Sequence, residues 1–220
     1  MSETYTGNVV PGGPPDVREI ESLVITKVVV GPHENNVYLL RCRKTGEQLL
    51  IDAADEAPRL LALVGSTGLS TVVTTHSHYD HWQALDAVLA ATGARSVAPA
   101  IDAPEIPSRM DELVGHGDRL KVGECELEVI QLAGHTPGGI ALLYEDRVGH
   151  AHLFSADSLF PGGVGDTGHD PVRFNSLLTD VETKVFNRLP DETWVYPGHG
   201  NDTTLGKERP SLPEWRARGW

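Results

Sequence analysis

The amino-acid sequence predicts an α/β fold in which two β-sheets face each other and helices cover their outer faces. Short runs rich in Val, Ile and Leu alternate with stretches whose apolar residues recur at helical spacing. Each half of the 220-residue chain has predicted strands followed by helical spacing. A chain of this length, with 40% hydrophobic residues, suits one well-buried domain. We expect that domain over residues 20–220, after a flexible leader over residues 1–19 in which Pro11–Pro15 opposes regular structure.

The first half of the chain predicts an antiparallel meander of strands, then two helices that flank one further strand. Gly31–Asn36 is expected to form the turn between the first two strands. Ala57–Val64 and Trp82–Ala91 have the apolar spacing of helices, and the β-branched run Ser70–Thr75 between them is typical of a buried strand. The meander strands are expected at Leu23–Val30, Val37–Cys42 and Gln48–Ile51.

The second half predicts four strands, one helix and a last short strand. Phe174–Leu189 carries apolar residues at helical spacing, and Gly162–Gly165 is expected to be a mobile loop. The C-terminal segment is polar, and we expect it to dock on the domain through Trp215 and Trp220. The expected strands are Asp118–Val122, Glu126–Leu132, Ile140–Tyr144, Ala151–Ser155 and Trp194–Tyr196.

Three imidazoles and one carboxylate lie within six consecutive positions, His76-Ser77-His78-Tyr79-Asp80-His81. Neutral imidazole nitrogen and carboxylate oxygen suit zinc, iron and manganese. The cluster lies between the end of a predicted strand and the start of a predicted helix, where α/β folds expose functional groups. A hydrogen-bonded surface loop is the structural alternative, but this residue combination favours a metal site.

Further candidate ligands share the same context, because each follows a predicted strand and most have a glycine or alanine beside them. Strand ends on one edge of a sheet sandwich can converge, and glycine lets the backbone crowd against a ligand. Seven ligands are too many for one tetrahedral metal but suit two metals that share a bridging carboxylate. The seven candidates are His76, His78, Asp80, His81, His135, Asp157 and His199.

Four motifs in sequence order resemble those of the metallo-β-lactamase-fold superfamily, and within it the compact hydrolases related to glyoxalase II. The resemblance runs from about Leu23 to Gly206. It implies a four-layer αββα sandwich with a metal centre at the edge between the sheets. The motifs are Thr75–His81, Gly134-His135-Thr136-Pro137-Gly138, Ser155-Ala156-Asp157-Ser158-Leu159-Phe160 and Pro197-Gly198-His199-Gly200.

By position, the resemblance implies that His76, His78 and His135 hold one metal. A second metal would be held by Asp80, His81 and His199, and Asp157 would bridge the two. Two divalent ions are therefore expected, with Zn²⁺ as the first choice and Fe or Mn as alternatives.

The resemblance implies a hydrolase of thioesters in which a hydroxide that bridges the metals attacks the carbonyl carbon. Asp80 is the candidate catalytic residue, because a carboxylate that is both a ligand and a hydrogen-bond acceptor can orient the nucleophile. The chain ends at Trp220, before the helical extension with which glyoxalase II contributes to glutathione binding, so the thiol carrier is left open. The alternatives are an iron-dependent persulfide dioxygenase, a lactone or β-lactam hydrolase, and a metal-binding protein without catalysis.

A small-molecule substrate is expected, and His33 and His169 are candidate substrate contacts because loops 31–36 and 161–171 would lie beside the metals in this fold. The net charge of −13 disfavours a nucleic-acid partner. Two cysteines outside any CxxC pair, no secretory signal in Met1–Asp16 and no membrane-length apolar run predict a cytoplasmic protein. The sequence does not specify an oligomeric state.

Overall fold

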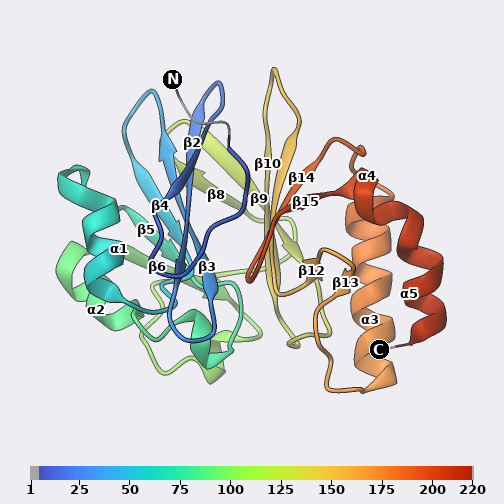
Figure 1. Ribbon diagram of the computed structural model, residues 1–220. Coiled ribbons are helices and arrows are strands. Elements are labelled where there is room, and N and C mark those ends of the chain that lie inside the picture. The colour runs from blue at the N-terminus through green and yellow to red at the C-terminus, as the bar shows by residue number, and fades with distance from the viewer. Residues whose placement is uncertain (1–4, 220) are drawn as a thin grey trace.

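Two mixed sheets lie face to face between two layers of helices (Figure 1). This arrangement is seen in a computed structural model that describes residues 5–219, and it confirms the predicted α/β sandwich. The first sheet contains seven strands in the order β1-β2-β3-β4-β5-β6-β7, and the second contains six in the order β15-β14-β11-β10-β9-β8. The two halves of the chain therefore form one sheet each.

The first sheet begins as the predicted antiparallel meander, β1 to β4, and continues with parallel pairing from β4 to β7. The change to parallel pairing matters for the site, because β4 and β5 then end at the same edge of the sheet. Its strands are β1 (Asp16–Glu19), β2 (Leu23–Val30), β3 (Asn35–Cys42), β4 (Gln48–Ile51), β5 (Thr71–Val73), β6 (Arg95–Pro99) and β7 (Glu112–Val114).

The second sheet is antiparallel except where β11 pairs with β14. Its strands are β8 (Arg119–Val122), β9 (Cys125–Gln131), β10 (Ile140–Glu145), β11 (Ala151–Ala156), β14 (Trp194–Pro197) and β15 (Thr203–Thr204). A separate hairpin joins β12 (Leu159–Phe160) to β13 (Gly163–Val164). Part of the predicted mobile loop Gly162–Gly165 is therefore a strand, because Gly163 and Val164 pair with β12.

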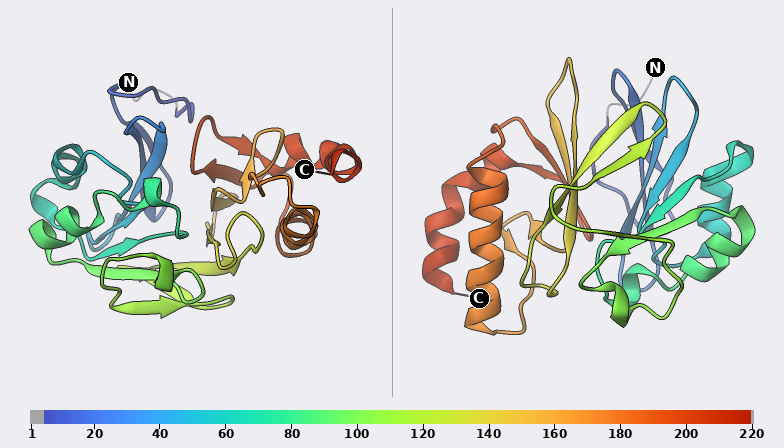
Figure 2. Two further views of the ribbon diagram at one scale, coloured as in Figure 1. Left: turned by 90° about the horizontal axis from the view of Figure 1, so that it is seen from below. Right: turned by 180° about the vertical axis from the view of Figure 1, so that it is seen from behind.

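Each sheet carries its own helices, on opposite sides of the molecule (Figure 2). The first sheet is covered by α1 (Ala57–Val64) and α2 (Leu85–Thr92), and the second by α3 (Pro171–Val181), α4 (Leu205–Glu208) and α5 (Leu212–Arg218). A π-helical turn, Glu182–Phe186, continues α3. Within residues 5–219 no helix is long and apolar enough to cross a membrane. Short 3₁₀ turns occur at Gly65–Thr67, Tyr79–His81, Ala103–Glu105 and Arg209–Ser211.

Apolar side chains form three buried clusters, one between the sheets and one under each helical layer. In α3, Phe174, Leu177, Leu178 and Val181 recur at helical spacing and are buried against the second sheet. The helix starts at Asp170, whose side chain accepts hydrogen bonds from the backbone N–H groups of the next turn, with Pro171 at the first helical position. Burial of the apolar face fixes the register of each strand. The polar residues at the end of the strand are therefore fixed in position as well.

Two terminal segments differ from the sequence expectation. Within the expected flexible leader, Asp16–Glu19 forms β1 and pairs with β2, and the Tyr5 hydroxyl donates a 2.6 Å hydrogen bond to Asp202. In the expected polar tail, α5 places Trp215 in the core at 1% exposure. The docking of Trp215 agrees with expectation, whereas Trp220 lies outside the described residues. Such short elements carry little periodic signal, and tertiary contacts decide them.

Candidate metal centre

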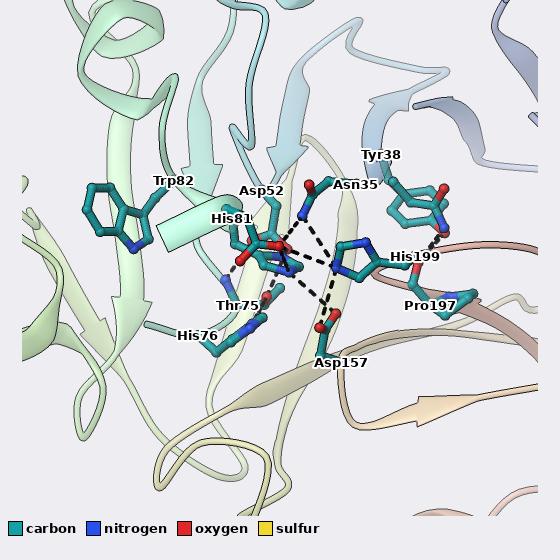
Figure 3. A network of polar contacts seen from close by, with 12 residues as sticks. Asn35, Tyr38, Asp52, Thr75, His76, His81, Trp82, Asp157, Pro197 and His199 are labelled. Carbon is teal, nitrogen blue, oxygen red and sulfur yellow. Dashed lines mark hydrogen bonds and ion pairs between the residues drawn. The ribbon is translucent and has the colours of Figure 1, made fainter. Parts of the chain in front are cut away.

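The structure brings all seven candidate ligands to one edge of the sandwich, where β5, β9, β11 and β14 end. Figure 3 shows His81, His199, Asp157 and Asn35 pointing toward one another across the gap between the sheets. Three groups have ligand atoms that all lie within 4.8 Å of one another. They are His76 with His78 and His135, Asp80 with His81 and His199, and His76 with His81 and Asp157.

Asp157 lies between the first two groups. Its Oδ1 is 3.4 Å from His81 Nε2, and its Oδ2 is 3.5 Å from both His135 Nε2 and His199 Nε2. The carboxylate therefore faces ligand atoms from both groups, as a bridging group must. Gly198 makes this approach possible, because a Cβ at that position would overlap Asp157 Oδ1.

The chemistry of the buried atoms fits a pair of divalent metal ions. Four buried ligand atoms have no hydrogen-bond partner among the described residues. They are the Nε2 atoms of His76, His81 and His135, and Asp157 Oδ1. Burying such atoms unpaired costs free energy, and a cation between them would remove that cost. Imidazole nitrogen with carboxylate oxygen is a donor set for Zn²⁺, Fe or Mn.

Four imidazole rings are oriented by hydrogen bonds that leave Nε2 facing the centre. His81 Nδ1 donates to Asp52 Oδ2 at 2.8 Å, and His76 Nδ1 lies 3.0 Å from Thr75 Oγ1. His135 Nδ1 donates to the Asp166 carbonyl at 2.7 Å, and His199 Nδ1 to the His33 carbonyl at 2.9 Å. Outer hydrogen bonds of this kind fix the tautomer of metal-binding histidines.

Asp52 is a functional residue that the sequence interpretation did not single out. It is 2% exposed, and its carboxylate accepts hydrogen bonds from Thr75 N and Thr75 Oγ1 as well as from His81, each at 2.8 Å. It therefore orients His81 directly and His76 through Thr75. The available signal was an acidic residue immediately after the apolar strand Gln48–Ile51.

Two further side chains that the sequence interpretation missed position the ligand loops. Asn35 Nδ2 donates to Asp80 Oδ2 at 2.8 Å. The buried Asp102 carboxylate accepts from Gly138 N at 2.6 Å and Ser77 N at 3.0 Å, so it joins the loop after β9 to the histidine cluster. Neither residue lies in a recognisable motif, and only the tertiary fold places them here.

Carboxylates and imidazoles at the centre shift each other's pKa values. Burial raises the pKa of Asp80, but hydrogen bonds with His199 and Asn35 outweigh it and hold this pKa below its usual range. Burial lowers the pKa of His199, yet hydrogen bonds with Asp157 and Asp80 raise it to about 9. The carboxylates are thus ionised and favour a positive charge among them. Metal binding would release the proton that His199 otherwise holds.

A cavity of about 480 Å³ opens beside the centre, within the usual size for a small-molecule site. Its walls are His135, Asp157 and His199, the segment 160–166, and Arg218. His33 and His169, the candidate substrate contacts, are not among these lining residues, and both are exposed. His33 reaches the centre only through its carbonyl. A larger cavity of about 590 Å³, around Cys42 and Cys125, contains none of the seven candidate ligands.

Comparisons with known proteins show the same family that the sequence motifs resemble. The family described as the Metallo-beta-lactamase superfamily matches residues 30–199. A hydroxyacylglutathione hydrolase of Polaromonas sp. strain JS666 is 37% identical over 180 residues, which are 80% of this chain and 66% of that protein. This chain therefore spans just under two thirds of that relative's length.

Two solved structures resemble most of the chain. ETHE1 from Myxococcus xanthus has a TM-score of 0.76 at 28% identity, and the match covers 88% of this chain and 84% of that one. TTHA1623, solved in a di-iron-bound form, has a TM-score of 0.71 at 31% identity and covers 86% of this chain and 98% of that one. A similar chain is thus known to hold two metal ions.

Proposed function

We propose that this chain, which belongs to the metallo-β-lactamase superfamily, is a hydrolase that cleaves thioesters with the help of two divalent metal ions. The observation that carries the proposal is the pair of three-residue groups that face the single carboxylate of Asp157 beside an open cavity. The 37% identical hydroxyacylglutathione hydrolase supports the acyl–sulfur bond as the target.

In this proposal His76, His78 and His135 hold one ion, and Asp80, His81 and His199 hold the other, with Asp157 between them. Zn²⁺ is the expected metal, and Fe or Mn would suit the same donors. When bound, such ions supply a Lewis acid for the carbonyl oxygen and lower the pKa of a coordinated water to about 7.

The chain's own residues orient the reactants. The ionised Asp80 carboxylate, held by Asn35, would accept a hydrogen bond from the attacking water and so orient it. Phe160 and Val164 offer an apolar wall along which the acyl chain can exclude solvent. Hydrolysis adds the water's hydroxyl to the acyl carbon, breaks the carbon–sulfur bond and delivers the proton to the departing thiolate.

A substrate panel tests the reaction class. Metal-loaded protein would be assayed with a thioester, a lactone, a β-lactam and a thiol persulfide, with oxygen uptake recorded for the last. We expect the thioester to give the highest kcat/KM and no oxygen to be consumed. Oxygen uptake with the persulfide, or lactone or β-lactam turnover exceeding that of the thioester, would overturn the proposal.

Replacing Asp80 with asparagine tests its role as the group that orients water. The substitution keeps the shape but removes the charge, so kcat is expected to fall by about 100-fold or more. Metal content is measured on the same sample, because Asp80 is also a proposed ligand. The matched control is Asp86→Asn, an exposed residue of α2, which should leave both values unchanged. Full activity with intact metal in the Asp80 variant would sink the assignment.

A further inference from the structure

Arg218, in the last turn of α5, contributes one wall of the cavity beside the metal centre. Its Nη2 lies 3.4 Å from the Gly162 carbonyl oxygen, and a Cβ on Gly163 would lie 3.1 Å from the same nitrogen. Figure 1 shows α5 on the same side of the molecule as α3 and the hairpin of β12 and β13. The guanidinium therefore packs on that hairpin, with Glu214 3.9 Å away on the same helix.

The hairpin connects Arg218 to the metal centre without a gap. At its far end, a Cβ on Gly165 would overlap the Asp157 carbonyl oxygen and lie 3.2 Å from His135 Nδ1. The wall between these two ends consists largely of glycine backbone together with Phe160, Pro161 and Val164. A molecule in the cavity can thus contact the metal ligands at one end and Arg218 at the other.

Arg218 is the only Lys or Arg among the described residues that line this cavity. The other ionisable side chains there are His135, His199, Asp157 and Asp166, and the Asp166 carboxylate accepts a 2.8 Å hydrogen bond from Gly168 N. In a chain of net charge −13, a guanidinium here is a local exception that attracts an anionic group. Its planar fork of N–H donors matches the geometry of a carboxylate.

We infer that Arg218 binds a carboxylate carried by the thioester and makes the enzyme selective for anionic substrates. The inference rests on the proposed function, because it names the substrate class of that same site. The carboxylate could belong to the acyl group or to the thiol carrier, and either would present the same chemistry to the guanidinium. If Arg218 served only to fasten α5 to the hairpin, its loss would affect neutral and anionic substrates alike.

Three thioesters distinguish these cases. S-acetyl-3-mercaptopropionate has its carboxylate on the thiol carrier, and S-ethyl monothiosuccinate has it on the acyl group. S-propyl thioacetate is neutral. In the Arg218→Gln variant, KM for one or both anionic thioesters is expected to rise about 10-fold or more. The neutral thioester should be unaffected, and metal content and thermal unfolding should not change. The control is Arg216→Gln in the same helix, whose side chain pairs with Glu182 and does not line the cavity.

Equal effects of Arg218→Gln on all three thioesters, or no effect on any, would overturn the inference. A binding measurement separates this outcome from a failure of the proposed function. Calorimetric titration of the metal-loaded protein with 3-mercaptopropionate and with 1-propanethiol requires no turnover. Tighter binding of 3-mercaptopropionate that is lost in Arg218→Gln would support the carboxylate site even if no thioester is hydrolysed. Equal affinity for the two thiols in the unmodified protein would contradict it.

Discussion

Replacing Asp157 with alanine is expected to reduce thioester hydrolysis by roughly 1,000-fold or more and to lower the metal bound per chain. The reason is the position of this carboxylate, whose two oxygens face His81, His135 and His199 at 3.4–3.5 Å. Removing it takes a ligand from both proposed ions and removes the one negative charge that faces all three of these imidazoles. Metal analysis and steady-state kinetics on the same preparation provide the measurement.

The control for this variant is Asp86→Ala, which removes an exposed carboxylate from α2 and should bind as much metal as the unmodified protein. Thermal unfolding after chelation separates an effect on metal from an effect on folding. An Asp157→Ala protein that keeps its full metal content and activity would show that this carboxylate does not bridge the two groups.

The second large expected effect concerns stability. Lys27 is 0% exposed, and its Nζ donates to the Gly7 carbonyl at 2.7 Å, the Gly200 carbonyl at 2.8 Å and Asp202 Oδ1 at 2.6 Å. The substitution Lys27→Met leaves the buried Asp202 carboxylate without its cation, which is expected to reduce the free energy of unfolding by about 3–5 kcal/mol. Gly200 follows His199 directly, so the variant should also hold metal more weakly. Urea unfolding at fixed pH measures the first effect.

An exposed ion pair provides the matched control. Lys44 and Glu124 are 2.8 Å apart, but their side chains are 73% and 58% exposed. Lys44→Met should therefore change the free energy of unfolding by less than about 1 kcal/mol. If Lys27→Met were no more destabilised than Lys44→Met, the buried pair would not be what fastens the His199 loop.

The sequence was most informative where chemistry-bearing residues follow strands. His76–His81, His135, Asp157 and His199 could be grouped because each follows a short apolar run, and the fold brings those strand ends together. The four-layer arrangement could also be predicted, since the order of strands and helix repeats in the two halves.

What the sequence missed depends on tertiary contacts. β6 and β7 have only five and three residues, and neither the pairing of β6 with β5 nor that of β7 with β6 gives a periodic signal of its own. Asp52 and Asp102 look like ordinary polar loop residues until the fold places their carboxylates under the ligand loops. His33 and His169 were expected to contact substrate because their loops would lie beside the metals. Their rings do not line the cavity.

If two metal ions held by these seven residues drive hydrolysis, turnover must follow the number of ions that each chain holds. The unmodified protein, purified without added metal and then loaded with Zn²⁺, would be analysed before and after chelation, with thioester turnover followed throughout. We expect two ions per chain, loss of turnover as they are removed, and recovery of turnover when they are restored. A chain that binds no metal, or one that hydrolyses thioesters equally well after complete removal, would contradict it.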